Sequence, residues 1–391
     1  MAKNPQYKIK TYNKISEAGL SKFKAGYEVA EKVDNPDAIM LRSFDLHKEP
    51  IADSVLAVGR AGAGVNNIPI DSLSKRGVVV FNAPGANANS VKEMVLAGMI
   101  IGGRNLAEAL QYTAGLTGGD MKAKVEAGKK KFVGNELVGK TLGVIGLGAV
   151  GYRVANAGVD LGMKVLGYDP AVTVRNAWQL SAEVNQIDDI NQLLQQSDYV
   201  TIHVPLLDST KGMIGTEKIG LLRPGSILLN FSRDELVDEK ALMAALDKGK
   251  IHSYVTDFPN PGVQGHPKVV AFPHLGASTG EAEDNCAIMI AGQLQDYLEN
   301  GNIRFSVNFP VTVLARKEGS VRLTLAHANK PGVVAQISDI LGAAKINIAD
   351  LLNKSRNDVA YTVVDLEMAT VSKELINHLE SIPELLKLRV I

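Results

Sequence analysis

The chain of 391 residues is too long for one ordinary hydrophobic core, so its length predicts two or three domains. Basic and acidic side chains number 42 each, and this balance argues against a nucleic-acid surface or a membrane-binding patch. Cys286 is the only cysteine, which excludes a disulfide within the chain, and the N-terminal residues lack the apolar core of a signal peptide. We therefore expect a cytoplasmic protein.

The first third of the chain contains three apolar runs that end in polar or charged residues, at 37–42, 54–60 and 77–82. Continuous apolar runs that alternate with helical segments are typical of a parallel sheet covered on both faces. The apolar stretch 94–101 is too short to span a bilayer. It predicts a helix that is buried within the chain or forms a dimer contact.

The segment 141–151 carries the most informative motif. An apolar run leads into G-x-G-x-x-G at Gly146, Gly148 and Gly151, and a second apolar run ends at Asp169. A strand, a glycine turn, a helix and an acidic residue about twenty positions further on form the dinucleotide-binding fingerprint. A carboxylate at Asp169 suits the ribose hydroxyls of NAD and repels the extra phosphate of NADP, so we predict NAD. A strand-end cap is the alternative role for this residue.

Four further apolar runs predict strands of the same sheet, at 199–204, 226–230, 254–257 and 269–272. Functional side chains in such sheets gather at the carboxyl ends of the strands. Arg233, Asp257 and His274 lie at or just beyond such ends. A histidine accepts a hydroxyl proton near neutral pH, and an arginine fork binds a carboxylate, so this set suits hydride transfer from a 2-hydroxy acid.

The pattern changes near residue 320, after a predicted helix over 281–298. An alternating strand, an amphipathic helix, another strand and a last helix follow, at 321–325, 333–344, 361–366 and 373–379. We expect residues 320–391 to form a separate small α+β domain.

Four motifs resemble the D-2-hydroxyacid dehydrogenase family over residues 38–310: those at 146–151, 203–206, 230–233 and 273–279. The resemblance implies that Arg233 holds the carboxylate and carbonyl of the substrate and that His274 is the acid/base. It also implies a carboxylate behind the histidine, usually a glutamate before a proline. The run 256–261 lacks that glutamate, so Asp257 is the candidate, with Glu281 as the alternative.

The same resemblance implies the cofactor-binding residues. His203 is ambiguous from its own context, because a lining role and a core role are equally open. The candidates are Gly146, Gly148, Ala149, Val150, Asp169, His203, Val204, Pro205, Thr210, Phe231, Ser232, Asp257 and Gly276. No metal site is predicted.

The N-terminal runs 40–43, 58–67 and 80–84 resemble the branch of the family that acts on 3-phosphoglycerate. The resemblance implies that Arg42 and Arg60 face the substrate phosphate, which two guanidinium groups suit physically. Surface ion pairing is the alternative role for both arginines. The other implied substrate-binding residues are Ser43, Ala61, Gly62 and Asn82.

The C-terminal runs 327–332 and 346–348 resemble an ACT domain, a small ligand-sensing module of amino-acid metabolism. The resemblance implies that His327, Asn329 and Asn347 bind L-serine between two paired modules. The alternative is a module that serves assembly only.

These observations predict an α/β protein with two doubly wound parallel-sheet domains and a small C-terminal α+β ACT domain. The substrate-binding domain is expected at 1–93 and 285–315, the inserted Rossmann NAD domain at 94–284, and the ACT domain at 320–391. The resemblance implies oxidation of the C2 hydroxyl of 3-phospho-D-glycerate to 3-phosphooxypyruvate, the first step of L-serine biosynthesis, by a homodimer or homotetramer. The alternatives are a glyoxylate or hydroxypyruvate reductase of the same family, and a non-catalytic NAD(H)-sensing protein.

Overall fold

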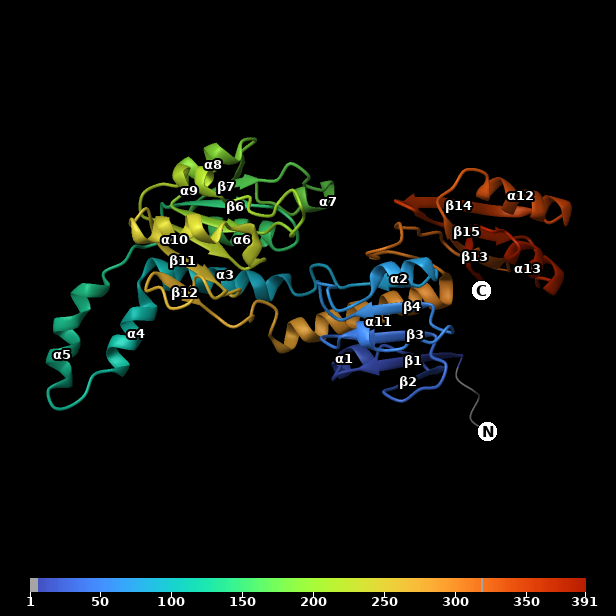
Figure 1. Cartoon of the computed structure of the whole chain (residues 1–391), viewed down its shortest axis with the longest axis horizontal. Helices are drawn as coiled ribbons and strands as arrows, with labels where there is room; N and C mark the ends of the chain where they lie inside the picture. The colour runs from blue at the N-terminus through green and yellow to red at the C-terminus, as the bar shows by residue number, and fades with distance from the viewer. Residues whose placement is uncertain (1–5, 318) are drawn as a thin grey trace. The chain divides into compact units, whose positions relative to one another are not determined.

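The computed structural model describes residues 6–317 and 319–391. The chain divides into two compact units, Met1–Asn87 with Glu283–Ile391, and Ala88–Ala282 (Figure 1). The residues from 320 onward belong to the first of these units by their contacts.

The first unit contains a five-stranded parallel sheet in the order β2-β1-β3-β4-β5. All residues of β3 are buried, which explains the unbroken apolar run in the sequence. The strands are β1 (Tyr7–Tyr12), β2 (Tyr27–Ala30), β3 (Ala38–Leu41), β4 (Ala57–Arg60) and β5 (Val79–Phe81). The helices are α1 (Glu17–Leu20), η1 (Leu46–Lys48), α2 (Ile70–Lys75) and most of α11 (Gly280–Asn300).

The second unit contains a seven-stranded parallel sheet in the order β12-β11-β10-β9-β6-β7-β8. Its strands are β6 (Thr141–Ile145), β7 (Lys164–Tyr168), β8 (Val184–Gln186), β9 (Tyr199–Ile202), β10 (Ser226–Asn230), β11 (Ile251–Thr256) and β12 (Val269–Ala271). Its helices are α3 (Ala88–Gly103), α4 (Leu106–Ala114), α5 (Met121–Gly128), η2 (Lys129–Phe132), α6 (Gly151–Asp160), α7 (Val174–Ala177), α8 (Ile190–Gln196), α9 (Thr216–Leu221), η3 (Asp234–Leu236) and α10 (Glu239–Asp247).

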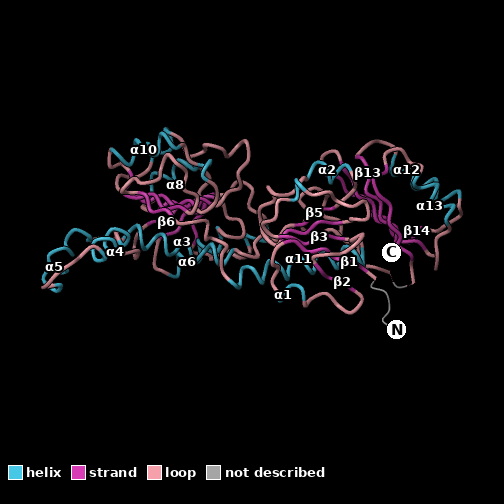
Figure 2. Tube along the Cα trace, turned by 60° about the horizontal axis from the view of Figure 1, so that its bottom comes forward, coloured by secondary structure: helices cyan, strands magenta, loops and turns pink. Residues whose placement is uncertain are grey.

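Helices cover both faces of this second sheet, as the magenta strands between cyan helices show (Figure 2). One core joins α3 and α6 to the sheet, and a separate core joins α8, α9 and α10 to its other face. The strand order reverses on either side of β6, between β9 and β7. Ligands of open α/β sheets bind at such a reversal, beyond the carboxyl ends of the strands.

Helices α4 and α5 extend away from the sheet of the second unit (Figure 1). No residue of α4 is buried, and the side chain of Leu110 is 72% exposed. The sequence analysis did not predict this helical hairpin, because its residues lack a clear apolar face. The predicted buried helix at 94–101 lies within α3 and forms half of it.

The C-terminal module is a four-stranded antiparallel sheet in the order β14-β15-β13-β16 with two helices on one face. Its elements are β13 (Val321–Ala328), α12 (Val333–Ala343), β14 (Ile348–Arg356), β15 (Val359–Leu366), α13 (Lys373–Glu380) and β16 (Leu385–Val390). On the other face, Ala326, Tyr361 and Val363 join the core that contains Phe81 and Tyr297 of the first unit. The predicted α+β character of this region is confirmed, and the module shares a core with the five-stranded sheet.

Within the described residues, no helix combines the length and apolar character that crossing a bilayer requires.

Candidate active site

The predicted cofactor-binding residues meet at one edge of the seven-stranded sheet. Ile145, the last residue of β6, pairs with the last residues of β7 and β9, and Asn230 of β10 pairs with the ends of β9 and β11. The residues that directly follow these strand ends therefore lie at the same edge of the sheet. They are Gly146, Asp169, His203, Phe231 and Asp257.

The glycine-rich loop lies at this edge and needs its glycines. Gly146 has φ +89°, and a Cβ there would lie 2.7 Å from the carbonyl oxygen of His203. A Cβ on Gly151 would lie 1.8 Å from the carbonyl oxygen of Gly146. A Cβ on Gly148 would meet nothing within 4 Å, so the backbone is open on that side. The loop leads through Val150 into the first turn of α6, whose terminus suits a pyrophosphate.

Asp169 is fixed beside this loop by two backbone hydrogen bonds. Its Oδ2 accepts from Leu147 N at 2.8 Å, and its Oδ1 accepts from Ala171 N at 2.9 Å. A carboxylate has about four acceptor positions, so capacity remains for two ribose hydroxyls. The residue therefore orders the loop as well as fitting NAD.

The strand-end residues that follow β9 and β10 are tied to each other. Ser232 Oγ donates to the Ile202 carbonyl at 2.7 Å, and Thr210 Oγ1 donates to the Pro205 carbonyl at 2.7 Å. Phe231 is buried beneath α3, where a Cβ on Gly98 would lie 3.0 Å from its ring. These contacts hold the rim of the site in one conformation.

His203 is in contact with Thr201, whose Oγ1 lies 2.9 Å from its Nε2. Burial lowers the pKa of His203 to about 3. The ring therefore stays neutral near pH 7, which favours a lining role over proton transfer.

We expect His203 to make folding sensitive to acid. Its folded-state pKa lies below the ordinary value of about 6.5, so below pH 6.5 the unfolded chain binds a proton that the folded chain does not. This proton uptake by the unfolded chain lowers the unfolding free energy by about 2 kcal/mol at pH 5, and the loss increases toward pH 3. Urea unfolding of His203→Gln at pH 7 and pH 5 should show a smaller acid loss than the wild type. A His378→Gln variant on α13 controls for loss of a histidine, and an equal acid loss in H203Q would contradict the assignment.

Arg233 and His274 are brought together by a residue that the sequence analysis did not single out. The ring of Phe258 lies 4.4 Å from the His274 ring, and the Arg233 guanidinium lies 5.3 Å from the Phe258 centroid. Arg233 Nη1 also donates to the Ser232 carbonyl at 2.6 Å. His274 is exposed. The signal for Phe258 was its place directly after Asp257, in the run compared with the family pattern.

Asp257 is 1% exposed and makes one side-chain hydrogen bond, in which its Oδ2 accepts from Gly276 N at 2.8 Å. Its Oδ1 is buried without a hydrogen-bond partner. Burial raises the pKa of Asp257, while Gly276, His274 and Arg233 act in the opposite direction. The carboxylate thus orders the His274 loop through the backbone N–H of Gly276.

Arg42 and Arg60 come from the adjacent ends of β3 and β4 in the first unit, where Leu41 pairs with Arg60. Burial raises the pKa of the Cys286 thiol, whereas the positive charges of Arg42 and Arg60 oppose that rise. The Arg42 guanidinium pairs with Glu283 in the first turn of α11, and the Arg60 guanidinium lies against Gly62. Asn82 follows β5 at the same edge, and Gln293 donates to its carbonyl at 3.2 Å.

The predicted effector residues each have their own partners in the C-terminal module. His327 is 2% exposed, and its ring nitrogens lie 2.8 Å from the Ala328 carbonyl and 2.9 Å from Thr362 Oγ1. Asn329 donates to the Asn357 carbonyl at 2.9 Å, and Asn347 donates to Glu367 at 2.6 Å. In the described part of the chain, no hydrogen bond joins any two of these three side chains.

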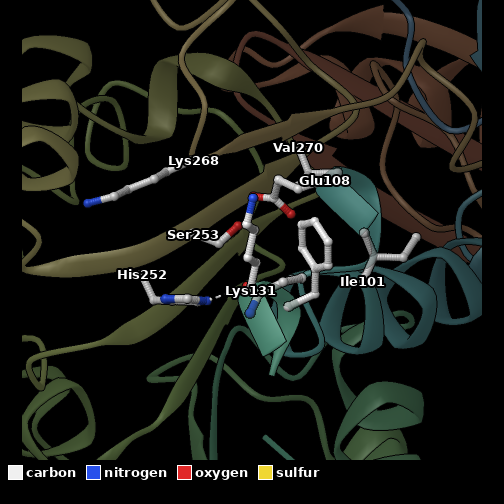
Figure 3. A pocket seen from close by; sticks show the side chains of 10 residues that line it. Ile101, Glu108, Lys131, His252, Ser253, Lys268 and Val270 are labelled. Carbon is white, nitrogen blue, oxygen red and sulfur yellow. Dashed lines mark hydrogen bonds between the residues drawn. The ribbon is translucent and has the colours of Figure 1, made fainter. Parts of the chain in front are cut away.

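The pocket in Figure 3 lies at the amino edge of the seven-stranded sheet, opposite the edge that carries Gly146, Asp169 and Asp257. Its cavity of about 280 Å³ is lined by His252 and Ser253, near the start of β11, and by Lys268 before β12. His252 Nε2 lies 2.8 Å from Asn105 Oδ1. The pocket contains none of the predicted site residues. Across residues 6–317 and 319–391, no cluster of three potential metal ligands occurs.

Comparisons with known proteins agree with this geometry. The family model for the D-isomer specific 2-hydroxyacid dehydrogenase, NAD binding domain, matches residues 105–276. The D-3-phosphoglycerate dehydrogenase of Methanocaldococcus jannaschii is 34% identical over 341 residues, covering 85% of this chain and 63% of its own length. The enzyme of that name from Haemophilus influenzae is 33% identical over 384 residues, covering 94% of this chain and 89% of its own length.

A solved structure of NAD+-bound 3-phosphoglycerate dehydrogenase from Entamoeba histolytica is similar, with 28% identity and a TM-score of 0.59. It covers 78% of this chain and 99% of its own. The chain belongs to the D-isomer specific 2-hydroxyacid dehydrogenase family. It is an NAD-dependent dehydrogenase, so the predicted fold class and cofactor are confirmed.

Proposed function

We propose that the protein oxidises the C2 hydroxyl of 3-phospho-D-glycerate to 3-phosphooxypyruvate, the first step of L-serine biosynthesis. The observation that carries the proposal is the placement of Arg42 and Arg60 at the adjacent carboxyl ends of β3 and β4, which supplies two guanidinium groups for a phosphate at one edge of the sheet. The names of the relatives from M. jannaschii and H. influenzae support the same substrate.

Each residue then has one task. Arg233 binds the substrate carboxylate, for which its planar fork is suited. His274 accepts the hydroxyl proton as the C2 hydride leaves. Asp257 holds the backbone of the His274 loop through Gly276. NAD, when bound, supplies the hydride acceptor, and the loop from Gly146 to Gly151 and Asp169 would hold it.

The test is NADH formation with 3-phosphoglycerate, compared with D-glycerate and D-lactate. We expect Arg42→Ala and Arg60→Ala to raise the KM for 3-phosphoglycerate about 10- to 100-fold, because each removes charge-assisted hydrogen bonds. The KM for D-glycerate should stay the same. Arg304→Ala, which breaks an ion pair with Asp296 in the same unit, is the control.

Two other outcomes separate the alternatives. Better turnover of the unphosphorylated acids would favour another 2-hydroxyacid dehydrogenase and assign Arg42 and Arg60 to surface ion pairing. NADH binding without turnover of any acid would favour a sensing protein. Binding is measurable from fluorescence transfer from Trp178, the only tryptophan, whose side chain is 81% exposed.

We further propose that the C-terminal module binds L-serine as a feedback inhibitor between two copies of the chain. The polar side chains of His327, Asn329 and Asn347 support this, as does the largely exposed strand β14 at the edge of the module's sheet. A homodimer or homotetramer in the cytoplasm is part of the proposal. Calorimetric titration with millimolar serine tests it, and an absence of binding would leave the module with an assembly role.

A further inference from the structure

A carboxylate accompanies the two arginines at the carboxyl ends of β3 and β4. Glu283 lies in the first turn of α11, and its Oε1 is 2.6 Å from Arg42 Nη1. The side chains of Arg42 and Glu283 are 35% and 43% exposed, so a solute can reach both groups. Among the ion pairs of residues 6–317 and 319–391, Glu283 is the carboxylate that contacts Arg42.

The packing of α11 places Glu283 there. Glu283, Cys286 and Ile290 are spaced by three and four residues, so they share one face of the helix. Cys286 and Ile290 are buried, and a Cβ on Gly59 would lie 2.5 Å from Ile290 Cγ2. The missing side chain at Gly59, directly before Arg60, therefore lets α11 approach the strand ends. The position of Glu283 is thus built into the core of the first unit.

The charge of Glu283 bears on any anion that binds to Arg42. Arg42 already pairs with the negative charge of Glu283, so an anion binding to Arg42 must compete with Glu283 and approach its charge. A single carboxylate offers Arg42 no more than Glu283 already does. A phosphate dianion offers a second charge and more acceptor oxygens, so it pairs more strongly with a guanidinium.

We propose that Glu283 is a positioning and specificity-determining residue that holds Arg42 in place of the substrate phosphate until that phosphate displaces it. The proposal rests on the proposed function for the identity of the substrate. Glu283 keeps the Arg42 guanidinium oriented in the free protein. Because Glu283 is charged, a ligand must carry more negative charge than a single carboxylate to displace it from Arg42.

The experiment measures KM and kcat for 3-phosphoglycerate in the wild type and in Glu283→Gln at low ionic strength. Glutamine keeps the size and the acceptor oxygen but removes the competing charge. We expect the KM to fall about fivefold with kcat unchanged, the size of an exposed ion pair of about 1 kcal/mol. The difference should shrink at high salt, where partly exposed charges are screened. The KM for D-glycerate should not change.

A matched control exists in the same unit. Glu28 forms an ion pair with Lys8 at 4.0 Å, and the Lys8 and Glu28 side chains are 37% and 44% exposed. Glu28→Gln makes the same chemical change at the same exposure, and we expect no effect on KM. Melting temperatures of E28Q and E283Q verify that both variants fold.

A raised or unchanged KM for 3-phosphoglycerate in E283Q would overturn the proposal. Calorimetric titration with inorganic phosphate separates this result from failure of the proposed function. If the wild type does not oxidise 3-phosphoglycerate, the proposed function fails, while tighter binding of inorganic phosphate to E283Q than to the wild type still supports the role of Glu283. Equal phosphate binding by both proteins would count against that role.

Discussion

Replacing His274 by asparagine should lower kcat by about 10²- to 10⁴-fold, the usual contribution of a positioned general base. The C2 hydroxyl proton would then lose its acceptor, while the residues that bind the substrate anions remain. Binding of NADH should be unchanged, because the glycine loop and Asp169 are held by backbone contacts that do not involve His274. Steady-state kinetics and NADH titration measure the two effects separately.

The control for this variant is His266→Asn. His266 lies in the same unit, 3.3 Å from Asp247, and precedes β12 at the amino edge of the sheet. We expect its kcat to match the wild type. If H274N keeps most of its kcat, His274 is not the proton acceptor, and the base must be sought elsewhere.

Replacing Arg322 by methionine should lower the unfolding free energy of the chain by about 3–5 kcal/mol, the cost of leaving one member of a buried ion pair without its partner. Arg322 and Asp365 are 0% exposed and contact each other through two hydrogen bonds of 2.7 Å. The Arg322 guanidinium also donates to the carbonyl groups of Asn300, Leu314 and Ala315. Its removal therefore leaves the buried Asp365 carboxylate and three backbone carbonyl groups without their hydrogen-bond donor.

Urea unfolding curves check this prediction, with two controls. Lys317→Met breaks the exposed pair with Glu367 in the same region, and we expect a change below about 1 kcal/mol. The double variant R322M/D365L removes both buried charges, so it should regain part of the lost stability. If R322M unfolds like K317M, the buried pair does not stabilise the C-terminal module.

The sequence predicted those parts of the fold in which one physical signal dominates. The unbroken apolar runs at 141–145 and 226–230 are central strands buried on both faces, and both strands are confirmed. The alternating run that begins at Val321 is also confirmed, as β13. One face of this strand packs against the module helices, and the other packs against the core of the five-stranded sheet.

Two strands with a weak apolar pattern were missed. Strand β14 is mostly exposed, and its nine residues follow no apolar pattern, so only its antiparallel hydrogen bonds to β15 define it. Strand β1 alternates Lys8 and Lys10 with Tyr7, Ile9 and Thr11. It was not predicted, although it lies between β2 and β3.

The site shows the same division. Gly146 and Asp169 were found by the glycine motif and its acidic residue, and Arg233 and His274 by the rule that ligands bind beyond strand ends. Phe258 contacts both Arg233 and His274 through its ring, a role that follows from its packing and was not read from its place beside Asp257. Glu283 escaped notice because its pairing with Arg42 depends on how α11 packs, which a linear sequence does not show.

The labelling rate of the Cys286 thiol measures how often α11 opens in this protein. Cys286 is the only thiol in 391 residues, it is 4% exposed, and it lies on the buried face of α11 one turn after Glu283, which pairs with Arg42. A thiol reagent reacts with it only when α11 lifts from the sheet, so the labelling rate reports the free energy of that opening in the unmodified protein. Ligands that bind at Arg42 and Arg60 should slow this labelling, which would make their affinity measurable without a coupled assay or an attached dye.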